Sequence, residues 1–337
     1  MFVFKPAVTV SRVGDPDLPV ALVFSGGPEI KIYDEVTSED LIAVHALQKG
    51  VPALPQGTLA DQAWRYWGLV DDVPELSIKA IQAHSKSREI AYRACFCRLG
   101  AAIATIEALT RAEVMLVGLG GLGCHVAEHL VRLGVRRFHL IDPDVVEASN
   151  LNRQIAYMPA DVGKPKAQVL AARLQELEAE RVVVHQDLAT ALNAAGADVT
   201  DAFVTADSDP HAIRRDVIRT LHPLGKRYGF AGYAGTVLTI SPLVTDPEAG
   251  CGACFEQLTD PGQAIAPLDW DGAIAPSSYA INAVGGALFV EHWMRGLSGG
   301  VPVRSLKFDT RDFSLTELPV QRLSLCPVCG VKARVVT

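Results

Sequence analysis

The hydrophobic positions between residues 113 and 205 alternate between short apolar runs and longer amphipathic stretches. Four runs have the length and composition of buried strands, namely 114–117, 137–141, 181–185 and 202–205. The stretches between them, such as 164–181, place leucines three and four positions apart, as on one face of a helix. Strands that alternate with helices predict an α/β fold with a doubly wound, mostly parallel sheet.

The first 84 residues have a different pattern. Two β-rich stretches, 2–13 and 19–33, precede two short helices, one capped at Ser38 and ending at Gly50, the other over 59–67. This order predicts a small winged-helix-like α+β domain over residues 1–84. The second domain then spans residues 85–337 and begins with a mostly helical connector over 85–112.

The composition narrows the class of protein. The 337 residues include 38 acidic and 31 basic side chains, which gives a net charge of −7, and 49% are hydrophobic. A mildly acidic chain of this kind is a poor candidate for binding nucleic acid or anionic lipid. It has no uncharged apolar run of about 18 residues, and its first residues do not resemble a secretory signal. We therefore expect no membrane span and a cytoplasmic location.

A glycine-rich segment joins the first strand of the second domain to the following helix. Gly118, Gly120, Gly121 and Gly123 lie where the backbone can approach a phosphate at a helix N-terminus. Asp142 ends the next strand, where a carboxylate can accept hydrogen bonds from ribose hydroxyls. These features predict nucleotide binding in a Rossmann-like fold, and they fit NAD as well as ATP.

Two polar segments follow the second strand. Residues 149–154, SNLNRQ, contain Asn150 and Arg153, and residues 163–166, GKPK, contain Lys166. An enzyme that makes pyrophosphate a leaving group needs cations to neutralise the charge on its phosphates. A nicotinamide site has no triphosphate to neutralise. The segments therefore favour ATP, with an NAD-dependent oxidoreductase as an alternative.

The chain has seven cysteines, of which four form two Cys-x-x-Cys pairs. These are Cys251 with Cys254 and Cys326 with Cys329. In a chain without a secretory signal this spacing indicates metal binding rather than disulfides. Four thiolates suit a closed tetrahedral Zn²⁺ site, and a site with no open position is structural.

In this order and spacing, the glycine segment, residues 142–144 (DPD), SNLNRQ and GKPK resemble the ThiF/MoeB superfamily, which includes the adenylating domain of ubiquitin-activating enzymes. The similarity covers roughly residues 87–337, and a zinc clasp is a feature of this superfamily too. The resemblance implies ATP-dependent adenylation of a carboxylate, with Asn150, Arg153 and Lys166 on the ATP phosphates.

The resemblance also assigns two further positions. Asp207 matches a catalytic, Mg²⁺-coordinating aspartate, with Asp209 as a near alternative. Arg88 matches an arginine that reaches into the partner subunit's ATP site, with Arg93 in reserve. The implied protein is a homodimer with composite sites, in which Arg88 acts in trans.

The extra N-terminal domain is similar to that of the MccB-like peptide-maturation enzymes of this superfamily. There it is a clamp that holds the precursor peptide as an added β-strand. The resemblance implies adenylation of a carboxylate on a ribosomally made precursor peptide, in the biosynthesis of a peptide antibiotic. An alternative is adenylation of a ubiquitin-like sulfur-carrier protein, and a non-catalytic alternative is a leader-peptide scaffold with an inactive site.

Overall fold

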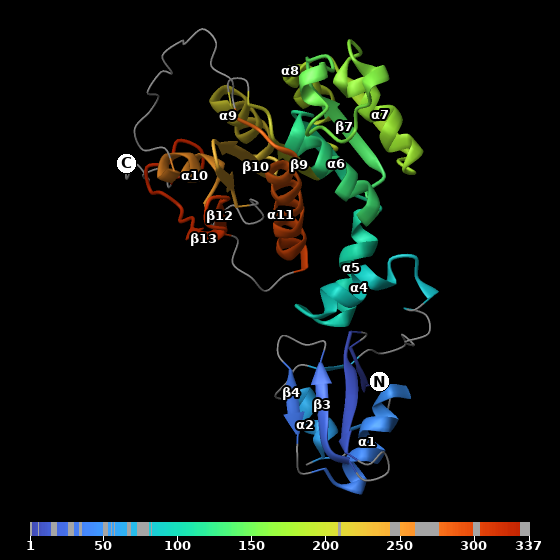
Figure 1. Cartoon of the computed structure of the whole chain (residues 1–337). Coiled ribbons are helices and arrows are strands. Elements are labelled where there is room, and N and C mark those ends of the chain that lie inside the picture. Colours follow the sequence, from blue (N-terminus) through green and yellow to red (C-terminus); the bar gives the residue numbers. More distant parts are fainter. Residues whose placement is uncertain are drawn as a thin grey trace, which may run out of the picture. The chain divides into compact units, whose positions relative to one another are not determined.

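The computed structural model describes residues 2–5, 7–14, 19–25, 30–33, 36–49, 53–54, 56, 58–65, 69–72, 81, 83–207, 210–242, 250–259, 276–298 and 304–330 (Figure 1). It divides into two compact units, residues 1–108 (unit 1) and 109–337 (unit 2). The division lies beyond the expected boundary at residue 84. The helices after that residue are held to unit 1 by hydrogen bonds from Lys5 Nζ to the Cys97 carbonyl (3.2 Å) and from the Leu99 N–H to Asp71.

Unit 1 combines two antiparallel sheets with short helices. β1 (Phe2–Phe4) pairs with β5 (Val70–Asp72), while β2 (Thr9–Gly14), β3 (Pro19–Ser25) and β4 (Lys31–Tyr33) form the other sheet in that order. The expected strand over 2–13 is thus two strands, because its halves belong to different sheets. α1 (Ser38–Lys49) and α2 (Leu59–Arg65) pack around a core that includes Leu22, Phe24 and Leu47.

The helices of unit 1 follow local capping rules. The residue that caps α1 is Thr37 and not Ser38: Thr37 Oγ1 accepts from the Asp40 N–H, and Asp40 accepts from the Thr37 N–H, both at 3.1 Å. α4 (Ser87–Ala94) and α5 (Leu99–Leu109) confirm that the connector is mostly helical.

Unit 2 is built on one large sheet. Its described strands lie in the order β13-β12-β11-β10-β9-β6-β7-β8. Their bounds are β6 (Glu113–Val117), β7 (Arg137–Ile141), β8 (Arg181–His185), β9 (Asp201–Val204), β10 (Arg227–Ala234), β11 (Val237–Ile240), β12 (Arg304–Asp309) and β13 (Ser314–Pro319). The strands from β10 to β8 are parallel, which confirms the predicted class. The strands from β11 to β13 continue the sheet in antiparallel register, an extension that the sequence did not predict.

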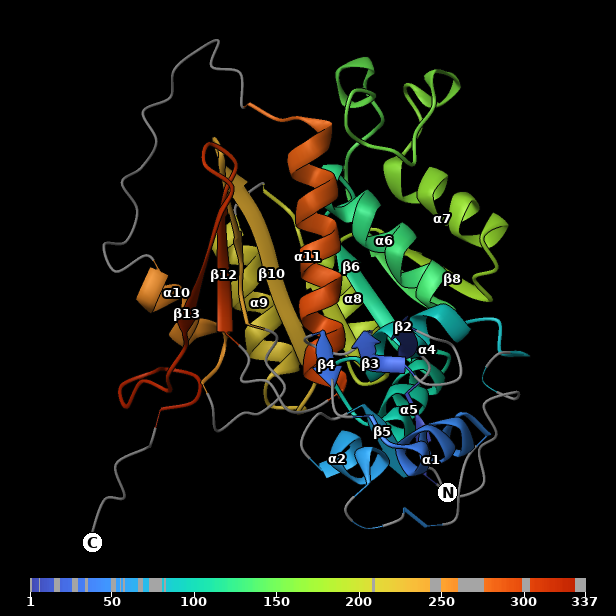
Figure 2. The same ribbon diagram turned by 60° about the horizontal axis from the view of Figure 1, so that its bottom comes forward.

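Helices cover both faces of this sheet (Figure 2). α6 (Gly121–Leu133), α7 (Lys166–Glu176) and α11 (Tyr279–Ser298) lie on one face, and α8 (Leu188–Ala195) and α9 (Pro210–Leu221) lie on the other. α7 ends earlier than expected, because Glu178 adopts a positive φ of 71° and the chain turns into β8. No helix in the described ranges is long and apolar enough to cross a membrane.

The strand order indicates where on the sheet a ligand is expected to bind. β6 lies between β7 and β9, so the chain crosses the sheet in opposite directions on the two sides of β6. In open α/β sheets, ligands bind at the carboxyl ends of the strands at this switch point. The segments that follow β6, β7 and β9 are those that carry the predicted functional residues.

Candidate nucleotide-binding site and cysteine cluster

A cavity of about 990 Å³ opens at the carboxyl ends of the parallel strands. Its walls include eight of the predicted residues, namely Gly118, Gly120, Gly121, Asp142, Asn150, Arg153, Lys166 and Asp207. The structure therefore brings together in one place segments that are nearly ninety positions apart in the sequence.

The glycines differ in what they do. Gly118 has a φ of 86°, and a Cβ there would lie 2.4 Å from the Ala206 nitrogen. A Cβ on Gly123 would lie 2.1 Å from the Gly118 carbonyl oxygen, so these two positions close the turn. Gly120 is open, since its Cβ would meet nothing nearer than the Gln154 side chain at 3.7 Å. Gly120 is thus the glycine that leaves room for a ligand.

Asp142 is fastened to the glycine segment. Its carboxylate accepts hydrogen bonds from the Leu119 N–H at 2.6 Å and the Asp144 N–H at 2.9 Å. Burial raises the pKa of Asp142, although these hydrogen bonds and Lys166 oppose the rise. From the other side the buried Tyr157 hydroxyl donates to the Leu119 carbonyl at 2.8 Å. The position of the loop is therefore set by side chains on both sides of it.

The predicted phosphate ligands lie along one wall of the cavity. Lys166 has a side chain only 8% exposed, and its Nζ lies 2.7 Å from Asp144. Arg153 is anchored by its guanidinium to the Ser149 carbonyl at 2.7 Å. Asn150 is buried and accepts from the Glu147 N–H at 3.1 Å. An ion pair or a hydrogen bond to a nearby residue therefore restrains each of the three side chains.

The structure describes most of the remaining predicted residues but not all of them. Asp207 is exposed and lines the cavity just after β9, whereas Asp209 lies outside the described residues. Arg88 is exposed on α4 of unit 1. Arg93 is buried and paired with Glu89 at 2.7 Å, which leaves Arg88 the better candidate for reaching another subunit.

The cavity fits a nucleotide with a triphosphate. The oxygen of the buried Gln154 side chain has no hydrogen-bond partner among the described residues, although Gln154 lines the cavity. An unpaired buried amide is costly, so a bound ligand or water is expected to supply its partner. Lys166 and Arg153 would hold the phosphates, and Asp207 would hold Mg²⁺, a cation that prefers oxygen ligands.

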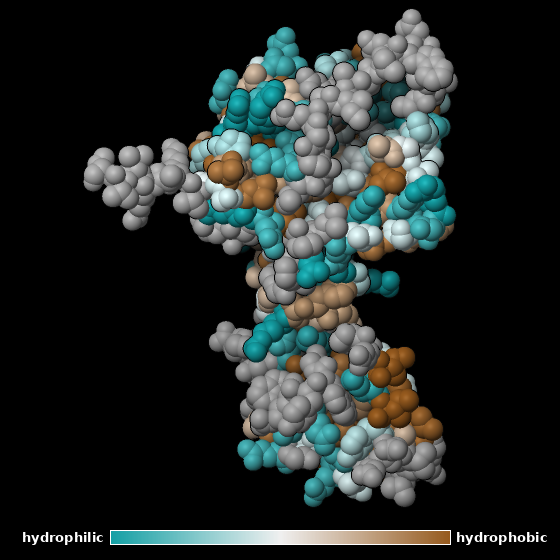
Figure 3. Space-filling model, turned by 90° about the vertical axis from the view of Figure 1, so that its left-hand side faces the viewer, coloured by the Kyte–Doolittle hydropathy of each residue, from teal (hydrophilic) through white to brown (hydrophobic). Residues whose placement is uncertain are grey.

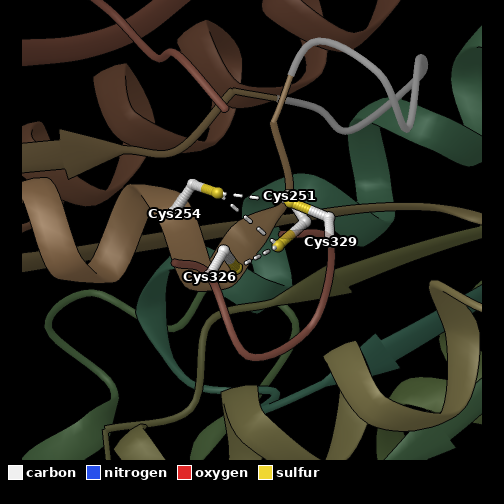
Figure 4. Close-up of side chains that lie close together, drawn as sticks. All are labelled: Cys251, Cys254, Cys326 and Cys329. Carbon is white, nitrogen blue, oxygen red and sulfur yellow. Dashed lines mark hydrogen bonds between the residues drawn. The ribbon is translucent and has the colours of Figure 1, made fainter. Parts of the chain in front are cut away.

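The four paired cysteines form one buried cluster (Figure 4). Their sulfur atoms all lie within 4.8 Å of one another. Cys251 Sγ is 3.9 Å from Cys254 and 3.5 Å from Cys326, and Cys254 is 3.3 Å from Cys329. Bonds of about 2.3 Å to a tetrahedral Zn²⁺ would require sulfur–sulfur distances of about 3.8 Å. The cluster therefore fits a structural zinc ion.

Burial makes two of these thiols harder to deprotonate, whereas a third loses its proton more readily. Burial raises the pKa of Cys251 and raises that of Cys329 to about 11. Burial also acts to raise the pKa of Cys326, but hydrogen bonds from the backbone N–H groups of Cys329 and Val328 and from the Cys254 and Cys251 side chains together outweigh it and lower that pKa to about 7. A cation bound among these sulfurs would stabilise the remaining thiolates.

The fold and the cavity define a doubly wound α/β domain with a candidate nucleotide-binding site at the carboxyl ends of its parallel strands. The ThiF family matches residues 95–328, and the chain belongs to this family. Its relatives and the family identify it as an ATP-dependent adenylyltransferase, an activity that implies ATP and Mg²⁺. The recognition made from the sequence is confirmed, and the NAD-dependent oxidoreductase is excluded.

Two relatives are similar in sequence. The chain is 34% identical over 232 residues to a sulfur carrier protein adenylyltransferase of Thermus thermophilus, which covers 66% of this chain and 84% of that protein. It is 30% identical over 235 residues to the sulfur carrier protein ThiS adenylyltransferase of Escherichia coli, which covers 66% of this chain and 88% of that protein.

Several solved structures are similar over nearly the whole chain. Among them is the crystal structure of E. coli MccB with AMPCPP and selenomethionine MccA. The TM-score is 0.74 at 18% sequence identity, and the match covers 98% of this chain and 99% of that one. The likeness shows that the two proteins share a fold, unit 1 included.

Proposed function

We propose that this protein adenylates a carboxylate of a ribosomally made precursor peptide, and that unit 1 is the clamp that holds the peptide. The observation that carries the proposal is the extent of the structural likeness. In structure, MccB with MccA bound matches 98% of this chain, unit 1 included. The sequence similarity to the sulfur carrier relatives covers 66% of it. Residues 1–94, which precede the ThiF family match, would then function in substrate recognition.

The surface of unit 1 supports a clamp. β4 is an edge strand of the β2-β3-β4 sheet in the described part of the unit. Ile32 on β4 is 69% exposed, and Ile30 just before it is 68% exposed. Figure 3 shows apolar residues gathered on one side of this unit. An open edge with apolar side chains beside it can accept a peptide strand, since the backbone supplies hydrogen bonds and the side chains supply register.

The side chains of unit 2 then have distinct tasks. ATP bound with Mg²⁺ supplies an electrophilic α-phosphorus and a pyrophosphate leaving group. Lys166 and Arg153 would neutralise the phosphate charge, Asp207 would fix the cation, and the N-terminus of α6 directs its backbone N–H groups at the phosphates. Arg88 of a second subunit would complete the site, and a zinc ion in the cysteine cluster would tie residues 326–329 to the start of α10 (Gly252–Thr259).

Adenylation of a sulfur-carrier protein is the second candidate. It is favoured by the 34% and 30% identities to sulfur carrier adenylyltransferases. The chemistry is the same and only the acyl substrate differs. The two candidates are therefore separated by offering each substrate to the same enzyme.

The test is ATP–pyrophosphate exchange with two probes, namely the short peptide encoded beside this gene and a ThiS-type carrier with a Gly-Gly tail. The proposal predicts exchange with the peptide. Exchange with the carrier alone would reject the peptide and support the second candidate.

A matched pair of variants tests the clamp. Ile32→Asp should weaken peptide binding at least tenfold, because it places a charge at the proposed strand-pairing edge. Ile42→Asp alters an equally exposed isoleucine (70%) on α1 and should leave binding unchanged. Titration of a labelled peptide measures both, and equal losses in the two variants would argue against the clamp.

A further inference from the structure

Arg214 is a cation of the cavity that the sequence did not indicate. It lies in α9, the helix that follows β9, and lines the cavity with Phe230 and Gly232 of β10. Its side chain is 22% exposed, so most of the guanidinium stem is removed from water. Burial lowers the pKa of Arg214 from its usual value, with Glu256 opposing the shift.

The guanidinium has a fixed orientation. Its central carbon lies 5.6 Å from the centre of the Phe230 ring, a distance that allows a cation–π contact. A Cβ on Gly232 would lie 3.8 Å from Arg214 Nη2, so the glycine leaves that nitrogen uncovered by a side chain. Arg214 therefore presents a positioned donor towards the cavity.

The positive charge of Arg214 has one carboxylate beside it. Arg214 Nη1 lies 3.7 Å from Glu256 Oε1, and the two side chains are 22% and 21% exposed. Glu256 lies in α10 and is shared, since His211 Nδ1 approaches the same oxygen at 3.9 Å. Because Glu256 divides its charge between these two partners, an anion that enters this corner of the cavity is still attracted to Arg214.

The corner lies on the other side of the switch point from the predicted phosphate ligands. Asn150, Arg153 and Lys166 all follow β7, on one side of β6. Arg214 follows β9 and faces β10, on the other side of β6. A cavity of about 990 Å³ is at the upper end of the range for one small ligand, so it has room for a nucleotide and for the end of a second substrate.

We propose that Arg214 binds the carboxylate of the peptide substrate before adenylation, and that Glu256 is a positioning residue that holds Arg214 in place. The inference rests on the proposed function. In the reaction a carboxylate oxygen forms a bond to the α-phosphorus, the bond from that phosphorus to the bridging oxygen breaks, and pyrophosphate leaves with the electron pair. Arg214 gains and loses no proton. It offsets the repulsion between the incoming carboxylate and the triphosphate.

The chain offers a matched control for the test. Arg214→Gln and Arg214→Lys alter the proposed ligand, and Arg215→Gln removes the neighbouring, exposed charge on the same helix. The probe is the short peptide encoded beside the gene, assayed by pyrophosphate exchange at saturating ATP. Binding of AMPCPP is measured by calorimetry on the full-length protein, and thermal unfolding shows that each variant is folded.

Arg214→Gln should lower kcat/KM for the peptide about 30-fold, which is about 2 kcal/mol at 1.4 kcal/mol per tenfold. Arg214→Lys should recover at least a third of that loss on a logarithmic scale, and Arg215→Gln should stay within threefold of wild type. The affinity for AMPCPP should stay within twofold in all three. Equal losses of peptide turnover and AMPCPP binding would place Arg214 on the nucleotide and overturn the inference, as would an unchanged kcat/KM.

Glu256→Gln separates positioning from binding. Alone it should lower kcat/KM for the peptide about fivefold, and combined with Arg214→Gln it should add nothing, because both act through one group. Additive losses would show that Glu256 acts independently of Arg214. If the wild-type enzyme does not exchange pyrophosphate with the peptide, the proposed function fails and the inference falls with it. If the wild type is active and only the Arg214 expectations fail, the inference alone is wrong.

Discussion

The same added methyl group should affect different properties at two glycines of the glycine-rich segment. At Gly123 it should lower stability, and at Gly120 it should weaken nucleotide binding. The structure assigns Gly123 to the closure of the turn and Gly120 to the space for the ligand. At Gly123 a Cβ would lie 2.1 Å from the Gly118 carbonyl oxygen and 3.1 Å from Thr205 Oγ1. At Gly120 the nearest atom would be the Gln154 amide nitrogen at 3.7 Å, an ordinary contact.

The magnitudes follow from these distances. Alanine normally stabilises a helix interior by about 1 kcal/mol relative to glycine. At Gly123 this gain is outweighed, because the clash is with backbone that cannot rotate away, and overpacking of this kind costs about 3 kcal/mol. We expect Gly123→Ala to lower the free energy of unfolding by about 2 kcal/mol. Gly120→Ala should cost about 0.5 kcal/mol, since glycine is only slightly better than alanine before α6.

Urea-induced unfolding and AMPCPP calorimetry together test the assignment. Gly123→Ala should shift the unfolding midpoint without a change in slope. Gly120→Ala should lower the midpoint only slightly and lose AMPCPP affinity about tenfold, because its methyl group occupies the approach to the phosphates. The reasoning is refuted if Gly123→Ala is as stable as wild type, or if Gly120→Ala binds AMPCPP normally.

Three further perturbations test other parts of the chain. Cys326→Ser should lower stability and release zinc, measured by metal analysis of the purified protein, and a protein purified without zinc and with oxidised thiols would contradict the assignment. A mixture of Arg88→Ala and Asp207→Ala chains should recover part of the exchange activity that each variant lacks, because one site of the mixed dimer is intact. No recovery in proven heterodimers would remove Arg88 from a role in trans. Stability should fall as the pH drops from 7.5 to 5.5, because burial lowers the pKa of His125, His185, His222 and His292 below 6.5. The unfolded chain then binds protons first, and a pH-independent urea midpoint would show that these shifts do not govern stability.

The parallel half of the sheet could be predicted from the sequence because its signals are local. β7 and β8 have the predicted bounds, β6 begins one residue earlier, and β9 is shifted by one residue at both ends. Each is a short, largely apolar run, and β6, β7 and β9 are largely buried, so burial and sequence pattern agree there. β8 lies at the edge of the described sheet and is more exposed. The glycine loop could also be predicted, since its glycines lie within six positions of one another. The backbone that a Cβ on Gly118 would meet, at Thr205 and Ala206, follows β9 and could not be predicted from local spacing.

The antiparallel extension was not predictable in the same way. β10 contains Gly229, Gly232 and alternating aromatic residues, and β11 is only four residues long. Such segments have only a weak intrinsic preference for the β-strand conformation. They form strands because neighbouring strands of the sheet pair with them. β12 and β13 lie beyond the long α11, so the pairing of β12 with β11 depends on contacts that are distant in sequence.

The same distinction separates the two sides of the cavity. The residues on the nucleotide side of the cavity come from contiguous sequence motifs, because a phosphate is bound by successive backbone N–H groups and by cations on one loop. The proposed acyl side is assembled from α9, β10 and α10, and the half-buried Glu256 lies 3.7 Å from Arg214 on a helix that starts at the cysteine cluster. A motif search cannot find such a group, since no local spacing relates its parts. If Arg214 binds the acyl substrate, a chain that keeps the motifs and changes α9 or α10 should retain the nucleotide site while changing the carboxylate that it accepts.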